Sequence, residues 1–334
     1  MSKRKYVRSR SRLRTPGLIA GALAATALIV REIAKAAEKK YPPEGKFVTV
    51  DGVRLHYTDT GGEGTPVVLL HGNGMTSADW RISGVTKALA LRYRVIAFDR
   101  PGFGYSERPR SRTWTPQAQA DIIKAALTEI GVSQPVVVGH SFGALVAAAY
   151  AIKHRRFVRG VVLVSGYYFP TFRADSLIFS PPAIPVLGDI LRYTISPIIG
   201  LVAGPLLFRK SFAPREIPER FSREFPLALA LRPWQIRATS ADAAMMMEAA
   251  AQLEDTYRSI SVPTAIVSGD ADEITDLRRQ SFRLHTRVPA SKMRIHAGIG
   301  HMVHYFAPNA ITNAIDTVSV GSRNYYWRRE LGRI

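Results

Sequence analysis

The sequence predicts an α/β protein whose mostly parallel, twisted sheet of about eight strands carries helices on both faces and a helical insertion after strand 6. Short apolar runs alternate with helix-forming stretches from residue 45 to 166. The alternation stops over 167–260, which is rich in proline and aromatic residues, and resumes over 261–320. A run that is apolar throughout is typical of a strand buried on both faces, which indicates a parallel sheet.

Each element follows from a local pattern. The runs KFVTV and VRLHYTD flank the turn Asp51-Gly52 and predict a hairpin of two strands. Six further strands are predicted after it, at 66–70, 93–98, 135–138, 158–164, 263–267 and 292–296, and the first three are expected to be buried. Helices are predicted between and after them at 78–91, 116–130, 142–154, 276–285 and 303–318. This order gives one sheet, interrupted by an insertion.

The strongest chemical signal is the G-x-S-x-G pattern Gly139-His140-Ser141-Phe142-Gly143, which lies between a predicted buried strand and a predicted helix. A serine on such a tight turn projects its hydroxyl out of the sheet, where a substrate can reach it. Because a serine hydroxyl is a weak nucleophile at neutral pH, a base must lie within hydrogen-bonding reach. Ser141 is therefore the candidate nucleophile.

His301 is the preferred base among the eight histidines. It stands in a glycine-flanked loop directly after a predicted strand, whereas His304 is expected to begin the final helix and to face elsewhere. A catalytic imidazole also needs an acceptor that fixes its tautomer. Asp270, Asp272 and Glu273 all follow the strand at 263–267, and Asp272 is preferred because the Gly-x-x-Asp turn should direct it back over the sheet.

Five blocks together resemble the signature of the α/β-hydrolase family, in its serine-nucleophile branch of esterases and C–C hydrolases. They are LHGNG at 70–74, FDRPGFGYS at 98–106, GHSFG at 139–143, GDAD at 269–272 and Gly300-His301, in the family order Ser, Asp, His. The resemblance implies an oxyanion hole formed by the backbone N–H groups of Asn73 and Phe142, with Gly74 as an alternative to Asn73. It implies structural roles for Asp99 and Arg100.

The resemblance implies a serine hydrolase that cleaves a carboxylic ester or related acyl bond of a small apolar molecule through an acyl-enzyme. Relatives that use an aspartate nucleophile are excluded because Ser141 occupies that position. A C–C bond hydrolase of the meta-cleavage-product type and a cofactor-free perhydrolase remain alternatives on the same triad. A non-catalytic, membrane-associated binding protein is the alternative from another class. No cofactor and no metal are expected.

The chain is divided into five segments. Residues 1–44 form a basic tail with a short apolar segment that resembles an anchor or a signal, and residues 321–334 form a basic, aromatic tail. The hydrolase core is predicted at 45–166 and 261–320, and a helical cap at 167–260. Within the cap, residues 190–208 are very apolar, but Pro197, Gly200, Gly204 and Pro205 are expected to break the run, so no membrane-spanning helix is predicted there.

The charge predicts an anionic partner. The chain carries a formal net charge of +20, and seven of its first fourteen residues are Lys or Arg. Because no nucleic-acid-binding module accompanies this charge, a membrane surface is expected as the partner and nucleic acid is not. The basic residues between 209 and 237 are interpreted as a solvated surface. The oligomeric state stays open.

The N-terminal segment governs the expected location. Residues 16–30 carry no charge, but this run is shorter than the roughly 20 apolar residues of an ordinary spanning helix. The excess of positive charge before it predicts that a spanning helix keeps its N-terminus in the cytoplasm and exports the rest. We expect a retained single anchor with the catalytic domain exported. A cleaved signal peptide with a soluble exported enzyme, or a cytoplasmic protein, are the alternatives.

Overall fold

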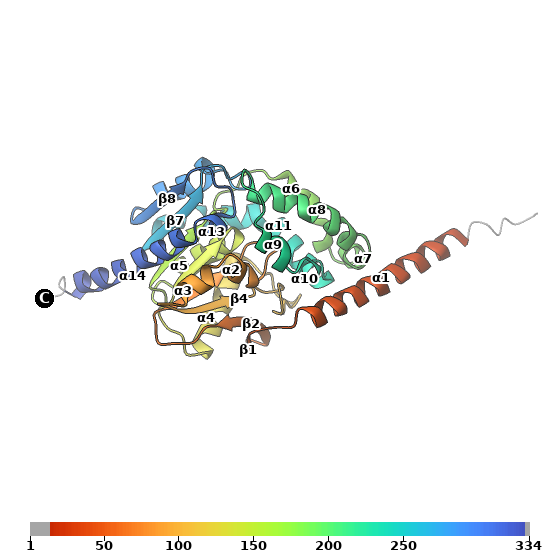
Figure 1. Cartoon of the computed structure of the whole chain (residues 1–334), viewed down its shortest axis with the longest axis horizontal. Helices are drawn as coiled ribbons and strands as arrows, with labels where there is room; N and C mark the ends of the chain where they lie inside the picture. Colours follow the sequence, from red (N-terminus) through yellow and green to blue (C-terminus); the bar gives the residue numbers. More distant parts are fainter. Residues whose placement is uncertain (1–13, 331–334) are drawn as a thin grey trace, which may run out of the picture.

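The computed structural model describes the backbone of residues 14–330 and the side chains of residues 17–319 except Asp175. The basic residues 1–13 and the side chains of the predicted 321–334 tail lie outside the described part. A central sheet is covered by helices, helix α1 (Arg14–Lys40) projects from one side of the body, and α14 (Pro308–Glu330) leaves it on the opposite side (Figure 1).

The sheet has eight strands in the order β1-β2-β4-β3-β5-β6-β7-β8. Strand β2 pairs antiparallel with β1 and β4, and the remaining neighbours are parallel. The predicted sheet, mostly parallel with about eight strands, is confirmed. The strands are β1 (Lys46–Val50), β2 (Val53–Asp59), β3 (Pro66–Leu70), β4 (Arg94–Phe98), β5 (Val136–His140), β6 (Gly160–Val164), β7 (Thr264–Gly269) and β8 (Ser291–His296).

Two hydrophobic layers cover the sheet. Successive side chains of a strand point to opposite faces, so Val68 and Leu70 of β3 join one cluster while Val67 and Leu69 join the other. Helices α4 (Pro116–Glu129) and α5 (Phe142–Lys153) pack in the first cluster, and α3 (Val85–Leu89) and α14 in the second. Covering both faces explains why the inner strands β3, β5 and β6 are apolar almost throughout.

Three predicted helices differ from the structure. The stretch at 78–91 forms two short helices, α2 (Ala78–Ile82) and α3, because Gly84 takes a left-handed φ of 85° between them. The final helix is split into α13 (Val303–Phe306) and α14, since the residue before Pro308 is disfavoured in helical geometry. The predicted helix at 276–285 is a π-helical turn at Arg278–Phe282 that continues into α12 (Arg283–Arg287).

The segment between β6 and β7 contains helices and no strand. Its longest apolar element, α8, is one continuous helix of 18 residues, so the prediction that Pro197, Gly200, Gly204 and Pro205 interrupt it was wrong. The run at 190–208 is divided instead at Thr194, between α7 and α8. Pro197 lies in the first turn, where no intrahelical N–H is required, and α8 accommodates Pro205 in its interior. The helices are α6 (Ala174–Phe179), η1 (Pro181–Ala183), α7 (Leu187–Tyr193), α8 (Ile195–Phe212), α9 (Glu219–Glu224), α10 (Leu227–Ala230), α11 (Pro233–Glu254) and η2 (Tyr257–Ser259).

Helix α1 is attached to the body by its C-terminal half. Val30, Ala34 and Ala37 recur at helical spacing and are buried. Glu38 forms an ion pair of 2.8 Å with the buried Arg232, which precedes α11. The sequence predicted that Arg232 is part of a solvated basic surface. This prediction was wrong, because Arg232 is buried and its ion pair with Glu38 holds α1 against the body.

Candidate active site

Ser141 occupies a strained turn between β5 and α5. Its φ of 55° and ψ of −120° lie where few non-glycine residues are found. The flanking glycines are required by close approach: a Cβ on Gly139 would lie 2.1 Å from the carbonyl oxygen of Gly143, and one on Gly143 would lie 2.3 Å from that of Leu70. The turn thus places Ser141, which is only partly buried, at the carboxyl edge of the sheet.

The structure brings His301 and Asp272 together from two loops at the same edge. Nδ1 of His301 lies 2.8 Å from Oδ2 of Asp272, and both side chains are almost fully buried. The carbonyl oxygen of His301 accepts a hydrogen bond of 3.1 Å from Nε2–H of His140, the residue before Ser141. The loop of the candidate base is therefore bonded directly to the turn of the candidate nucleophile.

The carboxylate of Asp272 is held in a fixed orientation. Oδ1 accepts the backbone N–H groups of Ile274 and Thr275 at 2.8 Å each, and Oδ2 accepts the hydroxyl of Thr275 at 2.7 Å. Burial alone would raise the pKa of Asp272, but the charge and hydrogen bond of His301, with the bonds from Thr275, lower it below its ordinary value. The group is thus an ionised acceptor for His301. Thr275 was not singled out from the sequence, although the Asp-x-x-Thr spacing is typical of such a turn.

The other candidate acids and bases lie elsewhere. Asp270 is exposed and accepts the N–H of Gly298, and Glu273 is exposed. His304 is fully buried in α13 and pairs with Asp79 rather than with the Asp272 loop. Among the residues considered from the sequence, only Asp272 contacts the His301 ring nitrogen.

Two backbone N–H groups near the turn have no hydrogen-bond acceptor among the described residues. In the described part of the chain, the N–H groups of Asn73 and Phe142 donate to no other residue. The side chain of Asn73 donates to the carbonyl oxygen of Thr239 at 3.0 Å, which ties its loop to α11. The N–H of Gly74 is already bonded to Oδ1 of Asn73 at 3.1 Å. This geometry favours Asn73 over Gly74.

A buried network supports the loop that carries Asn73. The backbone N–H of Arg100 donates to Nε2 of His71 at 2.9 Å, and its Nε–H donates to the carbonyl oxygen of His71 at 2.8 Å. Burial, followed by the charge of Arg100, lowers the pKa of His71 to about 4, so the ring is neutral at pH 7. Nδ1–H of this ring donates to the carbonyl oxygen of Gly72 at 2.8 Å. Arg100 thus holds the loop through His71.

Asp99 connects the loops on the other side. It accepts Nδ1–H of His56 at 2.7 Å and the backbone N–H groups of Ser77 and Tyr105. Burial alone would raise the pKa of Asp99, but the hydrogen bond and charge of His56 hold it at about 2. These contacts are structural.

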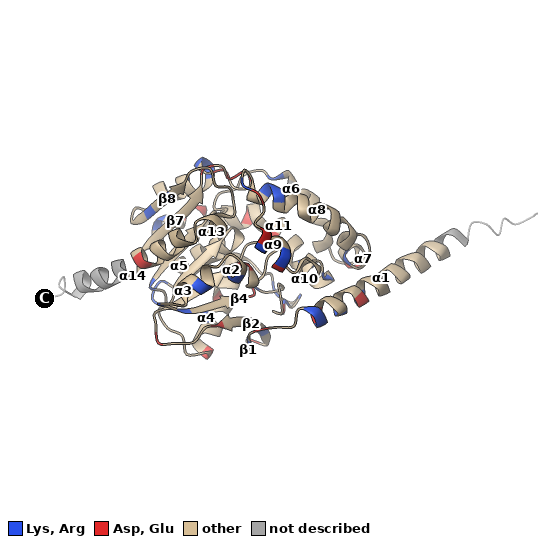
Figure 2. Ribbon diagram, viewed as in Figure 1, with Lys and Arg blue, Asp and Glu red and all other residues tan. Residues whose placement is uncertain are grey.

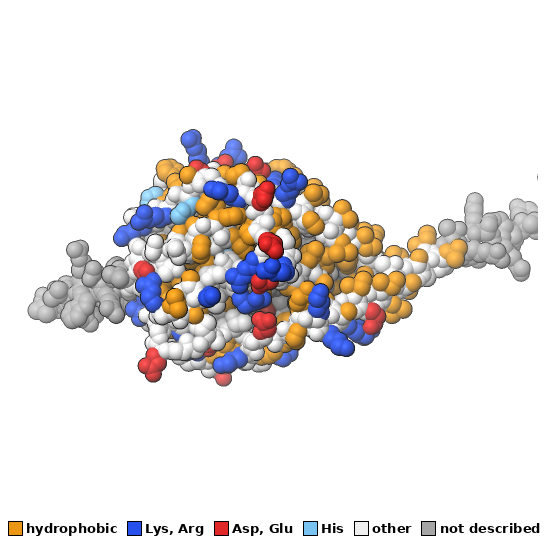
Figure 3. Space-filling model, viewed as in Figure 1, with side chains coloured by type: hydrophobic (Ala, Val, Ile, Leu, Met, Phe, Trp, Pro, Cys, Tyr) orange, Lys and Arg blue, Asp and Glu red, His pale blue; other side chains and the backbone are white. Residues whose placement is uncertain are grey.

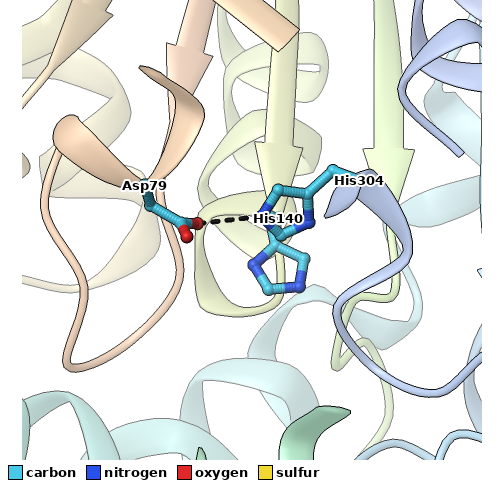
Figure 4. A group of neighbouring side chains, drawn as sticks. All are labelled: Asp79, His140 and His304. Carbon is cyan, nitrogen blue, oxygen red and sulfur yellow. Dashed lines mark hydrogen bonds and ion pairs between the residues drawn. The ribbon is translucent and has the colours of Figure 1, made fainter. Parts of the chain in front are cut away.

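Behind the site, Asp79, His140 and His304 form a fully buried group whose ligand-type atoms lie within 4.8 Å of one another (Figure 4). Nε2–H of His304 donates to Asp79 at 3.0 Å. Burial, followed by the charges of His304 and His301, lowers the pKa of His140 well below its ordinary value. Nε2 of His304 is bonded to Asp79, and Nε2 of His140 is bonded to the carbonyl oxygen of His301. The cluster therefore supports the His301 loop through His140. It is the one set of residues in the described part with metal-ligand spacing.

The comparisons with known proteins are consistent with this geometry. The family model described as "alpha/beta hydrolase fold" matches residues 65–308, which is more than half of the chain. A 2-hydroxymuconate semialdehyde hydrolase of Pseudomonas sp. is 29% identical over 274 residues, covering 79% of this chain and 90% of the relative.

Two solved structures are similar over most of their length. The esterase RhEst1 from Rhodococcus sp. has 25% identity and a TM-score of 0.63, covering 81% of this chain and 98% of the esterase. A bacterial membrane phospholipase A has 22% identity and a TM-score of 0.65, covering 93% and 97% of the two chains. At this low identity, the likeness to the phospholipase shows a shared fold and nothing about activity.

Proposed function

Because the chain belongs to the α/β-hydrolase fold family, we propose that it is a serine hydrolase that cleaves a carboxylic ester or related acyl bond of a small apolar molecule. Ser141 is the nucleophile, His301 the base and Asp272 the acid that orients the base. The observation that carries the proposal is the buried 2.8 Å hydrogen bond between His301 and Asp272, beside a serine on a strained strand-to-helix turn.

The roles follow from the geometry of the groups. Nδ1–H of His301 is directed at the ionised Asp272, so Nε2 is left unprotonated and can take the proton of the Ser141 hydroxyl as its oxygen attacks the acyl carbon. The N–H groups of Asn73 and Phe142 are the donors for the resulting oxyanion. His301 then returns the proton to the leaving alcohol, and the same steps with water release the acid.

Pre-steady-state kinetics with p-nitrophenyl esters of graded acyl length test this proposal. An acyl-enzyme predicts a burst of about one p-nitrophenolate per active site, followed by slower turnover. Ser141→Ala removes the nucleophile, so the burst should vanish while the circular dichroism spectrum stays unchanged. A wild-type-like burst in Ser141→Ala would contradict the role of Ser141.

A C–C hydrolase is the second candidate, and the similarity to the 2-hydroxymuconate semialdehyde hydrolase favours it. This reaction uses the same triad, so the distinction lies in the substrate. Loss of the dienoate absorbance of a meta-cleavage product, at a kcat/KM above that for every ester tested, would select the C–C hydrolase over the esterase.

We also propose that the protein is held at a membrane by α1 as a retained N-terminal anchor, with the catalytic domain exported. The segment Gly17–Lys40 of α1 and helix α8 are long and apolar enough to span a membrane, a test that a signal sequence also passes. Figure 2 shows the charged residues of α1 toward its body-proximal end, whereas α8 is mostly uncharged.

Exposed apolar side chains favour membrane contact by the cap as well. Figure 3 shows hydrophobic side chains along α1 and over the neighbouring end of the body, where α7 and α8 lie. Val202 and Leu206 of α8 are 70% and 65% exposed, and Leu18 of α1 is 74% exposed. Scattered exposed apolar residues are ordinary, but a contiguous set of this kind is typical of an interaction surface.

Fractionation of cells that produce the full-length chain tests the attachment. The protein should sediment with membranes and stay there through a high-salt wash, because burial of apolar side chains is not screened by salt. Its intact mass should include residues 1–44. Recovery in the soluble fraction at low salt without detergent would contradict the attachment, and a mass lacking the N-terminal segment would indicate a cleaved signal.

A further inference from the structure

A second candidate binding site lies between the segment that follows β4 and the cap. A cavity of about 240 Å³ is bounded by residues 108–114, by η1 and the start of α7, and by α11. Ser141, His301 and Asp272 do not line it. Its polar lining contains one carboxylate, that of Asp189, and five arginines: Arg108, Arg110, Arg112, Arg192 and Arg237.

Three carboxylates of the described chain pair with these five arginines, which leaves an excess of positive charge. Asp51 lies 4.0 Å from Arg112. Asp189 is shared between Arg110 and Arg192. Asp242, which is fully buried outside the cavity, is shared between Arg108 and Arg100. A guanidinium presents five N–H donors, so a shared carboxylate leaves several of them available for a further acceptor.

Two arginines retain unmatched groups at the cavity. Among the described residues, Arg237 pairs with no carboxylate, and its guanidinium donates to the carbonyl oxygen of Arg108. Nε–H of Arg192 is buried and has no hydrogen-bond partner in the same part of the chain. Buried charges and donors without partners destabilise the folded state, so the arrangement is suited to an added acceptor.

The electrostatic environment of Arg237 supports this view. Burial, followed by the charges of Arg110, Arg192 and Arg108, lowers the pKa of Arg237 to about 10. The guanidinium therefore stays charged at neutral pH, although its neighbours repel it. A bound anion would relieve both the repulsion and the missing hydrogen bonds.

The rest of the lining is apolar. Trp114, Ile184, Pro185 and Met245 line the same cavity. At its rim Ile184 is 49% exposed, and the neighbouring Val186 is 73% exposed. Such a cavity fits an anionic head joined to an apolar body better than it fits a fully hydrated ion.

We propose that this arginine-lined cavity binds a phosphate group, supplied either by the headgroup of an anionic phospholipid or by free phosphate. Arginine forks match the oxygens of phosphate in pairs of parallel hydrogen bonds. A phosphate offers more oxygens and more charge than a carboxylate, and the unmatched donors of Arg237 and Arg192 come from two different helices. The cavity is separate from Ser141, His301 and Asp272, so phosphate binding can be tested whether or not these residues are catalytic.

Calorimetric titration of the full-length protein in neutral detergent tests the site. The ligands are inorganic phosphate, dihexanoyl-phosphatidylglycerol and dihexanoyl-phosphatidylcholine, with chloride at matched ionic strength as the blank. Arg237→Gln should weaken binding at least tenfold, and Arg237→Lys, which keeps the charge but not the fork, should weaken it less. Arg223→Gln is the matched control, since Arg223 is exposed on α9 and does not line the cavity.

Each outcome decides the proposal. Phosphate binding that is lost in Arg237→Gln and kept in Arg223→Gln supports it, with free phosphate sufficient as the ligand. Binding of the phosphatidylglycerol alone, with the same pattern among the variants, supports it with the lipid headgroup as the source. Arg110→Gln, whose side chain is exposed, should repeat the loss if Arg237→Gln does not fold. No binding of any ligand, or equal weakening in Arg223→Gln, overturns it.

Discussion

Replacing Asp272 by asparagine is expected to lower kcat by about four orders of magnitude while leaving the fold intact. The amide oxygen can still accept the N–H groups of Ile274 and Thr275. The amide nitrogen would then face Nδ1 of His301 as a donor, so the proton of the imidazole moves to Nε2. An imidazole protonated at Nε2 cannot accept the proton of Ser141, and the nucleophile stays inactive.

Steady-state kinetics on the best ester from the graded series measures this effect. Asp270→Asn is the matched control because Asp270 is on the same loop, is exposed and contacts Gly298 rather than His301. The control should keep kcat within about twofold of the wild-type value. A loss of less than tenfold in Asp272→Asn would contradict the role given to Asp272.

Asp242→Ala is expected to destabilise the protein by about 3–5 kcal/mol, the cost of breaking a buried ion pair from one side. Asp242 and Arg100 are fully buried and 2.8 Å apart, and Arg108 bonds the second carboxylate oxygen. Without Asp242, the hydrogen-bond acceptors left to the guanidinium of Arg100 in the described part of the chain are Gln119 and the carbonyl groups of the His71–Gly72 segment. Since Arg100 supports the loop that carries Asn73, activity should fall together with stability.

Urea unfolding followed by tryptophan fluorescence measures the change in free energy. Asp121→Ala is the control, because Asp121 forms ion pairs with Lys153 and His154 at the surface, and such pairs contribute about 1 kcal/mol or less. Equal losses of unfolding free energy in the two variants would show that the buried pair of Asp242 with Arg100 stabilises the fold no more than a surface ion pair does.

The fold could be predicted because its signals are local. The buried inner strands are short runs rich in Val, Ile and Leu, and many of the turns between elements contain glycine, proline or aspartate. Helix ends were less predictable: a left-handed Gly84 split one helix, whereas Pro205 did not interrupt α8. The outcome at a proline depends on whether the rest of the helix is supported, which the sequence pattern does not reveal.

The candidate site was predictable where chemistry and spacing coincide, as at Ser141, His301 and Asp272. These three residues remain predictions for catalysis, although the structure pairs two of them. The contacts that support them were not predictable, because they join residues far apart in the chain. Asp242 meets Arg100 across 142 positions, and His304 meets Asp79 across 225, with no local pattern to mark either pair.

The arginine-lined cavity shows the same limit. Arg237 belongs to the basic stretch that was interpreted as a solvated surface, and its charge alone does not distinguish a cavity from a surface. The distinction arises from burial and from the arginines of 108–112, which the fold brings next to α11. Such a site can be found only after the chain is folded.

Covalent labelling with a fluorophosphonate probe, followed by peptide mass spectrometry, tests the central claim most directly. The account predicts one adduct per chain on Ser141, no labelling of Ser141→Ala, and labelling slowed by orders of magnitude in His301→Ala. An unlabelled, folded wild-type protein, or an adduct on another residue that persists in Ser141→Ala, would contradict the assignment of Ser141 as an activated nucleophile.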